Sequence, residues 1–259
     1  MANKMYRDIE LLLAARSADD VWDQFVTVMA QRGYPHVFYS LRRFADMSRL
    51  WLASDLELRG NFPDGFTADI VGEGILPNTP WGLWSQHHRG VRSFDWAESD
   101  EANAYRHPTG MKLLKVLREH DLAAGHVVSL FGVSARVSGT VALATGVGTG
   151  QAHADQLWEE SGRSVRALCE VMHLRVCALP QTIGPGVLTP RQRQVVEWAA
   201  YGKTVAEIAE ILGVEATTIE KHLRLAREAL GAGTTAQAIL QAHQRNLIFV
   251  HDQVENEER

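Results

Sequence analysis

Residues 188–230 constrain the fold of this chain most strongly, because they carry the start signals of short consecutive helices. Thr189 is a favourable N-cap residue, and Gln192 stands three positions later, where its side chain can complete a capping box. Thr204 and Glu207 repeat this arrangement for a second helix. A third helix follows a short glycine turn, so the segment predicts a tight three-helix unit.

The third helix is expected over about residues 216–230, and it has two different faces. One face is an apolar stripe whose members recur at helical spacing: Ile219, Leu223, Ala226 and Leu230. The opposite face carries Lys, Arg and Thr, which can contact phosphates and base edges. In a helix-turn-helix, the second helix of the pair enters the major groove of DNA. We expect the DNA-contacting residues to be Thr204, Thr217, Thr218, Lys221, Arg224 and Arg227.

Charge alone does not identify this unit as DNA-binding. Residues 188–245 contain seven Lys or Arg and six Glu, and the whole chain has a formal net charge of -5. A helical hairpin with an ordinary solvated face would have the same balance. The DNA-binding interpretation therefore depends on the capped three-helix pattern.

A resemblance to the LuxR family of quorum-sensing transcription regulators is carried by the segment LTPRQRQVVEWAAYGKTVAEIAEILGVEATTIEKHL. It includes the opening LTPR, Trp198, the GKT at 202–204, the EIA at 207–209 and the pattern that ends at His222 and Leu223. The departures are Gln192 where the family has Glu, Val196 where Leu is usual, and Glu215 where Ser commonly caps the recognition helix. Glu215 is a weaker cap in this position.

The resemblance implies a regulator that binds double-stranded promoter DNA as a homodimer. Two copies would occupy half-sites about one helical turn apart, since one recognition helix reads too few base pairs. The helix expected after the recognition helix, over 235–244, and a long helix over 150–176 are the candidate dimer interfaces.

Proline and glycine between residues 179 and 187 mark a domain boundary. A chain of 259 residues with 46% hydrophobic content can build a second core beside the helical unit. We therefore divide the chain into a sensor domain at 1–177, a linker at 178–187, a helix-turn-helix domain at 188–250 and an acidic tail at 251–259.

The sensor region alternates helical and strand patterns, so the fold class is α+β. Helices are expected at 4–16, 19–32, 64–73, 80–89, 99–120 and 150–176. Strands are expected at 36–41, 49–54, 126–132 and 137–145. We expect an α-β-α sandwich joined to an all-α domain, which is similar to the family's sensor domain that encloses an acyl-homoserine lactone.

Most polar residues that hold the lactone in the family have no counterpart here. By the resemblance, Phe66 stands in place of a Trp that donates to the lactone carbonyl, and Ile70 replaces a Tyr. Thr79 replaces an Asp that accepts from the ligand amide. The Ser or Thr that the family carries on the late strand corresponds to a position near Val141 or Ala142 of this chain. Trp96 and Gly125, in contrast, match the family.

Each buried polar group of a lactone that lacks its partner costs about 1 to 3 kcal/mol, so this protein should not bind acyl-homoserine lactones in the usual way. Either the cavity takes a different, more apolar ligand, or side chains fill it, and we favour the filled cavity because large aromatic residues usually belong to the core. The expected pocket residues are Trp51, Phe62, Phe66, Ile70, Thr79, Trp96 and Ser129.

Two other regulators fit parts of the sequence. A response regulator with the same DNA-binding unit would need a phosphoacceptor Asp at the end of a strand, but Asp19 and Asp20 fall in a helical stretch. A conventional lactone receptor with a variant pocket is the other alternative.

Enzymatic activity is not expected, because no nucleophile, base and orienting acid stand in a recognisable order. The histidines and two cysteines form no metal-binding pattern, and we expect no cofactor beyond a small-molecule ligand. We find no signal or transmembrane segment, so we expect a cytoplasmic protein without a membrane partner.

Overall fold

The computed structural model describes residues 2–42, 56–63, 65–66, 70, 75–134, 137–180 and 188–249. These residues fall into two compact units, Met1–Cys177 and Ala178–Arg259. The strand expected at 49–54 and the acidic tail at 251–259 lie outside the described residues, as do most of the helix expected at 64–73 and most of the linker.

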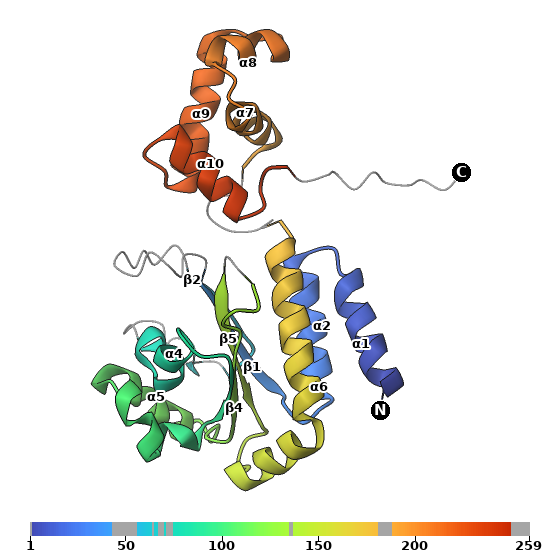
Figure 1. Ribbon diagram of the computed structural model, residues 1–259, viewed down its shortest axis with the longest axis vertical. Coiled ribbons are helices and arrows are strands. Elements are labelled where there is room, and N and C mark those ends of the chain that lie inside the picture. Colours follow the sequence, from blue (N-terminus) through green and yellow to red (C-terminus); the bar gives the residue numbers. More distant parts are fainter. Residues whose placement is uncertain are drawn as a thin grey trace. The chain divides into compact units, whose positions relative to one another are not determined.

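A five-stranded antiparallel sheet forms the middle layer of the first unit (Figure 1). In spatial order its strands are β2 (Leu56–Gly60), β1 (His36–Arg42), β5 (Ser138–Ala144), β4 (Gly125–Ser129) and β3 (Gly90–Ser93). The strands expected at 36–41, 126–132 and 137–145 correspond to β1, β4 and β5. Two strands, β2 and β3, were not predicted, because with five and four residues they are too short for a clear period-two pattern.

Helices cover both faces of this sheet, so the expected α-β-α sandwich is confirmed. On one face lie α1 (Ala2–Ala14), α2 (Ala18–Ala30) and the long α6 (Gln151–Ala178) (Figure 1). On the other lie α4 (Pro80–Trp84) and α5 (Pro108–Glu119) (Figure 1). Buried aromatic and aliphatic side chains pack in the layer between the sheet and α4 and α5.

The prediction of one continuous helix over 99–120 is wrong. The chain instead forms two 3-10 helices, η3 (Asp95–Glu98) and η4 (Asp100–Tyr105), before α5 begins. The cause is Pro108, because a residue that precedes proline is driven out of the helical region. His107 accordingly has an extended backbone, with φ -127° and ψ 136°, and becomes the N-cap of α5. The helix expected at 80–89 is also shorter, since α4 ends at Trp84.

Helix α5 packs against a single-turn 3-10 helix, η2 (Leu76–Asn78), through the surface of Gly110. A Cβ atom on Gly110 would lie 1.8 Å from the carbonyl oxygen of Asn78, so only glycine permits this approach. The contact matters because η2 leads directly into Thr79 and α4.

We predict that Gly110→Ala lowers the free energy of unfolding by about 1 to 3 kcal/mol, because the added methyl group must displace a backbone carbonyl. Urea denaturation of the first unit in the full chain measures the effect. Lys115→Ala on the exposed face of α5 is the matched control and should change stability by less than about 0.5 kcal/mol. Equal stability of the two variants would contradict the close approach.

The second unit consists of α7 (Pro190–Ala200), α8 (Val205–Leu212), α9 (Ala216–Leu230) and α10 (Thr235–Gln244). The two predicted capping boxes, at Thr189 and at Thr204, are present. Glu215 caps α9 without a side-chain hydrogen bond, as its residue type indicated. The predicted apolar stripe of α9 is confirmed, since its members are buried: Ile219, Leu223, Ala226 and Leu230.

The capping box of α8 is built reciprocally. The Thr204 hydroxyl accepts from the Glu207 N–H at 3.3 Å and donates to the Glu207 carboxylate at 2.9 Å. The backbone N–H of Thr204 donates to the same carboxylate at 2.8 Å. These hydrogen bonds, led by the backbone one, lower the pKa of Glu207 and keep it ionised at neutral pH.

Thr204→Ala should lower the local opening free energy of α8 by about 1 kcal/mol, because the Glu207 amide group loses its hydroxyl acceptor. Hydrogen exchange of the α8 amides in the full chain reports this quantity. Thr204→Ser preserves the hydroxyl and should exchange like the wild type. If the alanine variant exchanged at the wild-type rate, the cap would carry no stability.

Candidate DNA-binding surface and ligand cavity

The exposed face of α9 presents three of the six expected DNA-contacting residues. Thr217, Lys221 and Arg224 are exposed, on the side opposite the buried stripe. Glu215, the N-cap of α9, makes no side-chain hydrogen bond, so the leading N–H groups of this helix have no side-chain partner there. A helix face of this kind can contact DNA phosphates and base edges.

The other expected DNA residues are engaged within their own unit. Thr204 holds the α8 capping box, and Thr218 is half-buried. Arg227 donates to the Thr235 hydroxyl at 3.2 Å and so links α9 to α10. Arg224 also has an internal partner, since its guanidinium lies 2.6 Å from the Glu228 carboxylate. Because this pair is exposed, it contributes little to stability and can be exchanged for a phosphate.

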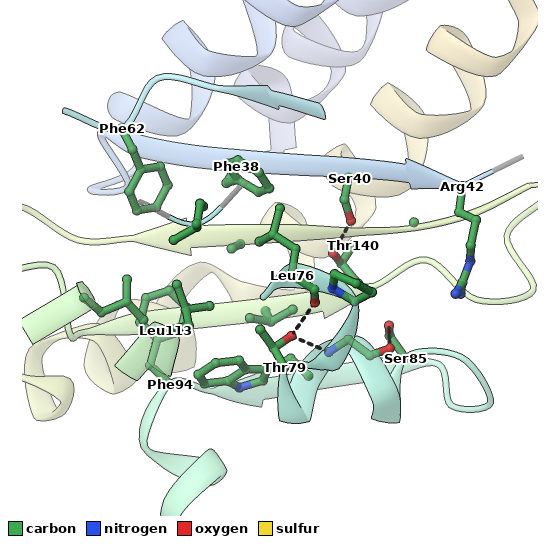
Figure 2. Close-up of a pocket in the computed structure, with 18 of the residues that line it drawn as sticks. Phe38, Ser40, Arg42, Phe62, Leu76, Thr79, Ser85, Phe94, Leu113 and Thr140 are labelled. Carbon is green, nitrogen blue, oxygen red and sulfur yellow. Dashed lines mark hydrogen bonds between the residues drawn. The ribbon is translucent and has the colours of Figure 1, made fainter. Parts of the chain in front are cut away.

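The first unit contains a partly open cavity of about 100 Å³ between the sheet and α4 and α5 (Figure 2). One water needs about 10 to 15 Å³ of such space, so the cavity is several times larger than a water site. The described side chains thus leave space here, whereas we favoured a filled cavity from the sequence. Its lining consists of Phe38, Ser40, Arg42, Phe62, Phe66, Ile70, Leu76, Pro77, Thr79, Trp81, Gly82, Ser85, Phe94, Leu113, Leu117, Val127, Ser138, Gly139, Thr140 and Ala142.

Four expected pocket residues do line the cavity: Phe62, Phe66, Ile70 and Thr79. Phe62 stacks on Phe66 with 4.4 Å between ring centroids, and Phe38 meets the Phe62 ring edge-on at 6.3 Å. These rings give one part of the cavity an apolar wall without hydrogen-bonding groups.

Thr79 is held by the protein's own backbone. As N-cap of α4, its hydroxyl accepts from the Gly82 N–H at 2.9 Å and donates to the Leu76 carbonyl at 3.0 Å. A hydroxyl has a single donor and two acceptor lone pairs. One uncharged acceptor position therefore remains for any ligand, where an Asp would offer a carboxylate.

Trp96 and Ser129 do not belong to the cavity lining, which corrects two assignments. Trp96 is buried beside Trp84, with ring centroids 5.9 Å apart. Ser129 is fully buried and its hydroxyl donates to the His88 carbonyl at 2.6 Å, so it anchors the chain after α4. Trp51 lies outside the described residues.

A polar group on β1 and β5 also lines the cavity, and it was not predicted from the sequence. Every second residue of β1 from Phe38 onward lies on the same face, namely Phe38, Ser40 and Arg42. The register pairs these residues with Ala142, Thr140 and Ser138 of β5, in that order. Alternation within the HVFYSL strand could have assigned Ser40 and Arg42 to one face. The β1–β5 register could not be read from the sequence, and it is this register that brings the two strands' hydroxyl groups together.

The polar group is connected by hydrogen bonds. The hydroxyls of Ser40 and Thr140 lie 2.7 Å apart, and the Arg42 guanidinium donates to the Ser138 hydroxyl at 3.3 Å. Burial lowers the pKa of Arg42 from its ordinary value. That value is so high that the guanidinium remains charged at neutral pH.

Across the described part of the chain, no group of three or more His, Cys, Asp or Glu side chains is placed to hold a metal ion. Within the same residues, no helix has the length and apolar character needed to span a bilayer.

Two family descriptions match this chain. Residues 17–176 match the autoinducer binding domain, and residues 186–242 match the bacterial regulatory proteins of the luxR family. The first of these matches covers more than half of the chain.

Curated relatives are similar over parts of the chain. The transcriptional activator protein BjaR1 of Bradyrhizobium diazoefficiens is 27% identical over 62% of this chain and 63% of its own. The activator YukR of Yersinia ruckeri is 41% identical over 22% of this chain and 25% of its own. The matched regions thus span less than two thirds of either relative.

A solved structure of Escherichia coli SdiA shares the fold over 95% of this chain and 98% of its own, with a TM-score of 0.52 and 17% identity. CepR2 from Burkholderia cenocepacia has a TM-score of 0.51 and 17% identity over 66% of this chain and 93% of its own. At these identities the likeness concerns the fold alone. The two family matches follow one another along the chain, with an autoinducer-binding domain before a DNA-binding helix-turn-helix domain. The protein therefore belongs to the LuxR family of bacterial transcriptional regulators.

Proposed function

We propose that this LuxR-family regulator binds promoter DNA as a homodimer through α9, and that its sensor domain responds to a small molecule other than an acyl-homoserine lactone held in the usual way. The observation that supports the proposal of a different ligand is the hydrogen bonding of Thr79. Its hydroxyl is bonded to backbone groups at the start of α4. The family's charged acceptor for a ligand amide is therefore replaced by a structural cap.

The DNA-binding half is supported by the surface of α9. Lys221 and Arg224 are exposed on the face opposite the buried stripe, and neither packs in the core of its unit. The near-neutral charge of the unit means that specific contacts supply the affinity. Dimerisation is supported by α10, where Leu240 leaves 51% of its surface exposed for a second copy to cover.

Lys221→Ala and Arg224→Ala should each weaken promoter binding at least about tenfold, because a specific base or charged contact is worth about 1 to 3 kcal/mol. The melting temperature should stay within about 1 °C, since both side chains are exposed and surface substitutions are nearly neutral. Gel-shift titration at physiological salt measures the affinity.

Lys115→Ala removes the same kind of charge from the sensor domain and serves as the control for this experiment. Its affinity for the promoter should equal that of the wild type. Unchanged binding by both α9 variants would remove this helix from the DNA interface.

The ligand half is supported by the composition of the cavity. Phe66 and Ile70, at the positions of the family's Trp and Tyr, offer no side-chain hydrogen bonds to a lactone. Each unpaired buried polar group costs about 1 to 3 kcal/mol. The solved SdiA complex contains octanoyl-rac-glycerol, and this fold therefore accommodates a ligand without a lactone ring.

A conventional lactone receptor is the competing function, because CepR2, which has the same fold, is described as N-acylhomoserine lactone dependent. Wild-type protein purified from a host that makes no such lactones separates the two. Our proposal expects soluble protein without added lactone. Insoluble protein that N-octanoyl-homoserine lactone rescues would establish the conventional function instead.

Thr79→Asp should strengthen the binding of N-octanoyl-homoserine lactone at least about tenfold, because a carboxylate accepts from the ligand amide through a charge-assisted hydrogen bond. Asp is also a good N-cap, so α4 should persist. Calorimetric titration gives the affinity, and Thr79→Asn is the uncharged control that should gain much less. A wild-type affinity equal to that of the Asp variant would refute the argument from Thr79.

A further inference from the structure

Glu220 is an exposed acidic residue in the first half of α9, and its carboxylate forms no hydrogen bond or ion pair with any residue that the structure describes. Helix α9 begins at Ala216, so Glu220 lies in its second turn. In a helix-turn-helix, this N-terminal part of the recognition helix contacts the base edges. A carboxylate is therefore placed where DNA is expected to lie.

The surface neighbours of Glu220 are residues that we expect to contact DNA. On a helix, residues three and four positions apart are neighbours on the surface. Thr217 stands three positions before Glu220 and Arg224 four positions after it, and both are exposed. Glu220 thus belongs to the same exposed surface of α9, although it was not among the DNA-contacting residues predicted from the sequence.

The cation beside Glu220 is paired with a different carboxylate. The Arg224 guanidinium lies 2.6 Å from the carboxylate of Glu228, which is one turn further along α9. Lys221 follows Glu220 directly, and adjacent residues of a helix do not face each other. Among the described residues, the charge of Glu220 is therefore left without a cation that pairs with it.

An unpaired carboxylate on a DNA-binding surface is favourable against some bases and costly against others. It is repelled by the phosphates, and its two oxygens accept hydrogen bonds but donate none. If it is taken out of water against another acceptor, it loses its hydration and gains no hydrogen bond. Against a donor it recovers a hydrogen bond that involves a charged group. Such a residue selects a sequence mainly by penalising the wrong bases.

Cytosine presents the donor that suits a carboxylate best. In the major groove cytosine offers its N4 amino group, whereas guanine offers the acceptors N7 and O6, and thymine the acceptor O4 and a methyl group. Adenine has an amino group at N6, but the acceptor N7 lies beside it and would repel the second carboxylate oxygen. A carboxylate at this place on α9 therefore favours cytosine.

We propose that Glu220 determines sequence specificity by accepting a hydrogen bond from the N4 amino group of one cytosine in each half-site. This inference rests on the proposed function, which it deepens by naming a base that the DNA partner carries. Glu220 contributes to the choice of sequence rather than to the total affinity, because the same carboxylate is repelled by the surrounding phosphates.

Selection of binding sites from a random DNA library by the purified full chain tests this proposal. The library is double-stranded with a random core of about 20 base pairs, which spans two half-sites one helical turn apart. In the sites selected by the wild type, one position of each half-site should favour cytosine at least about fivefold, the lower limit for a good base contact. Gel-shift titration of a selected site and its single-base variants measures this preference.

Two substitutions assign the cytosine preference to the carboxylate. Glu220→Ala should lose it and bind the four bases at that position within about threefold of one another, which is below the effect of one base contact. Glu220→Gln should also lose it and favour adenine, because a Gln amide pairs with N6 and N7 of that base. Glu220 is exposed, so both variants should melt like the wild type.

Glu210→Gln is the matched control, since Glu210 is an exposed acidic residue of the neighbouring helix α8. This variant should keep the cytosine preference of the wild type. Loss of the preference in both Glu220 variants is the result that the proposal requires.

Retention of the cytosine preference by either Glu220 variant would overturn the inference, because the carboxylate would then not be its source. Wild-type sites that show no such cytosine would overturn it as well. Both results leave the proposed function standing, since a defined site is still bound. If the wild type enriches no sequence from the library, the DNA-binding half of the proposed function fails, and the inference fails with it.

Discussion

The antiparallel pairing of β1 with β5 is the constraint on which the sensor domain depends. It runs without a break from His36 opposite Ala144 to Arg42 opposite Ser138, and it joins positions that are about a hundred residues apart in sequence. Because side chains alternate along a strand, this register divides both strands between two environments. A slip of one residue would exchange the two faces and place the hydroxyl groups in the opposite core.

The two faces of this pairing explain both the stability of the domain and the character of its cavity. Toward α6, Tyr39 is fully buried and its hydroxyl lies 2.9 Å from Nδ1 of the equally buried His173, so this face is closed. Toward α4, Ser40 and Thr140 line the cavity. The α4 layer is held by local devices, namely the Thr79 cap and the Gly110 contact, and the cap leaves Thr79 with a single uncharged acceptor position for a ligand.

Sequence reasoning succeeded where the determinants are local. The caps at Thr189 and Thr204 and the stripe of α9 depend on residues a few positions apart, and each is present in the structure. It failed where the determinants are distant or where one residue overrides a pattern. Pro108 interrupts the helix that was expected over 99–120. Ser129 does not line the cavity, because its hydroxyl donates to the His88 carbonyl. Arg42 became a cavity residue only through a strand register that no local pattern specifies.

Mass spectrometry of the small molecules released from natively purified protein tests most directly the claim that this sensor has lost lactone recognition. The protein would be produced in a host that makes acyl-homoserine lactones. The expected result is the release of a small molecule that is not an acyl-homoserine lactone. Stoichiometric recovery of an acyl-homoserine lactone would contradict it.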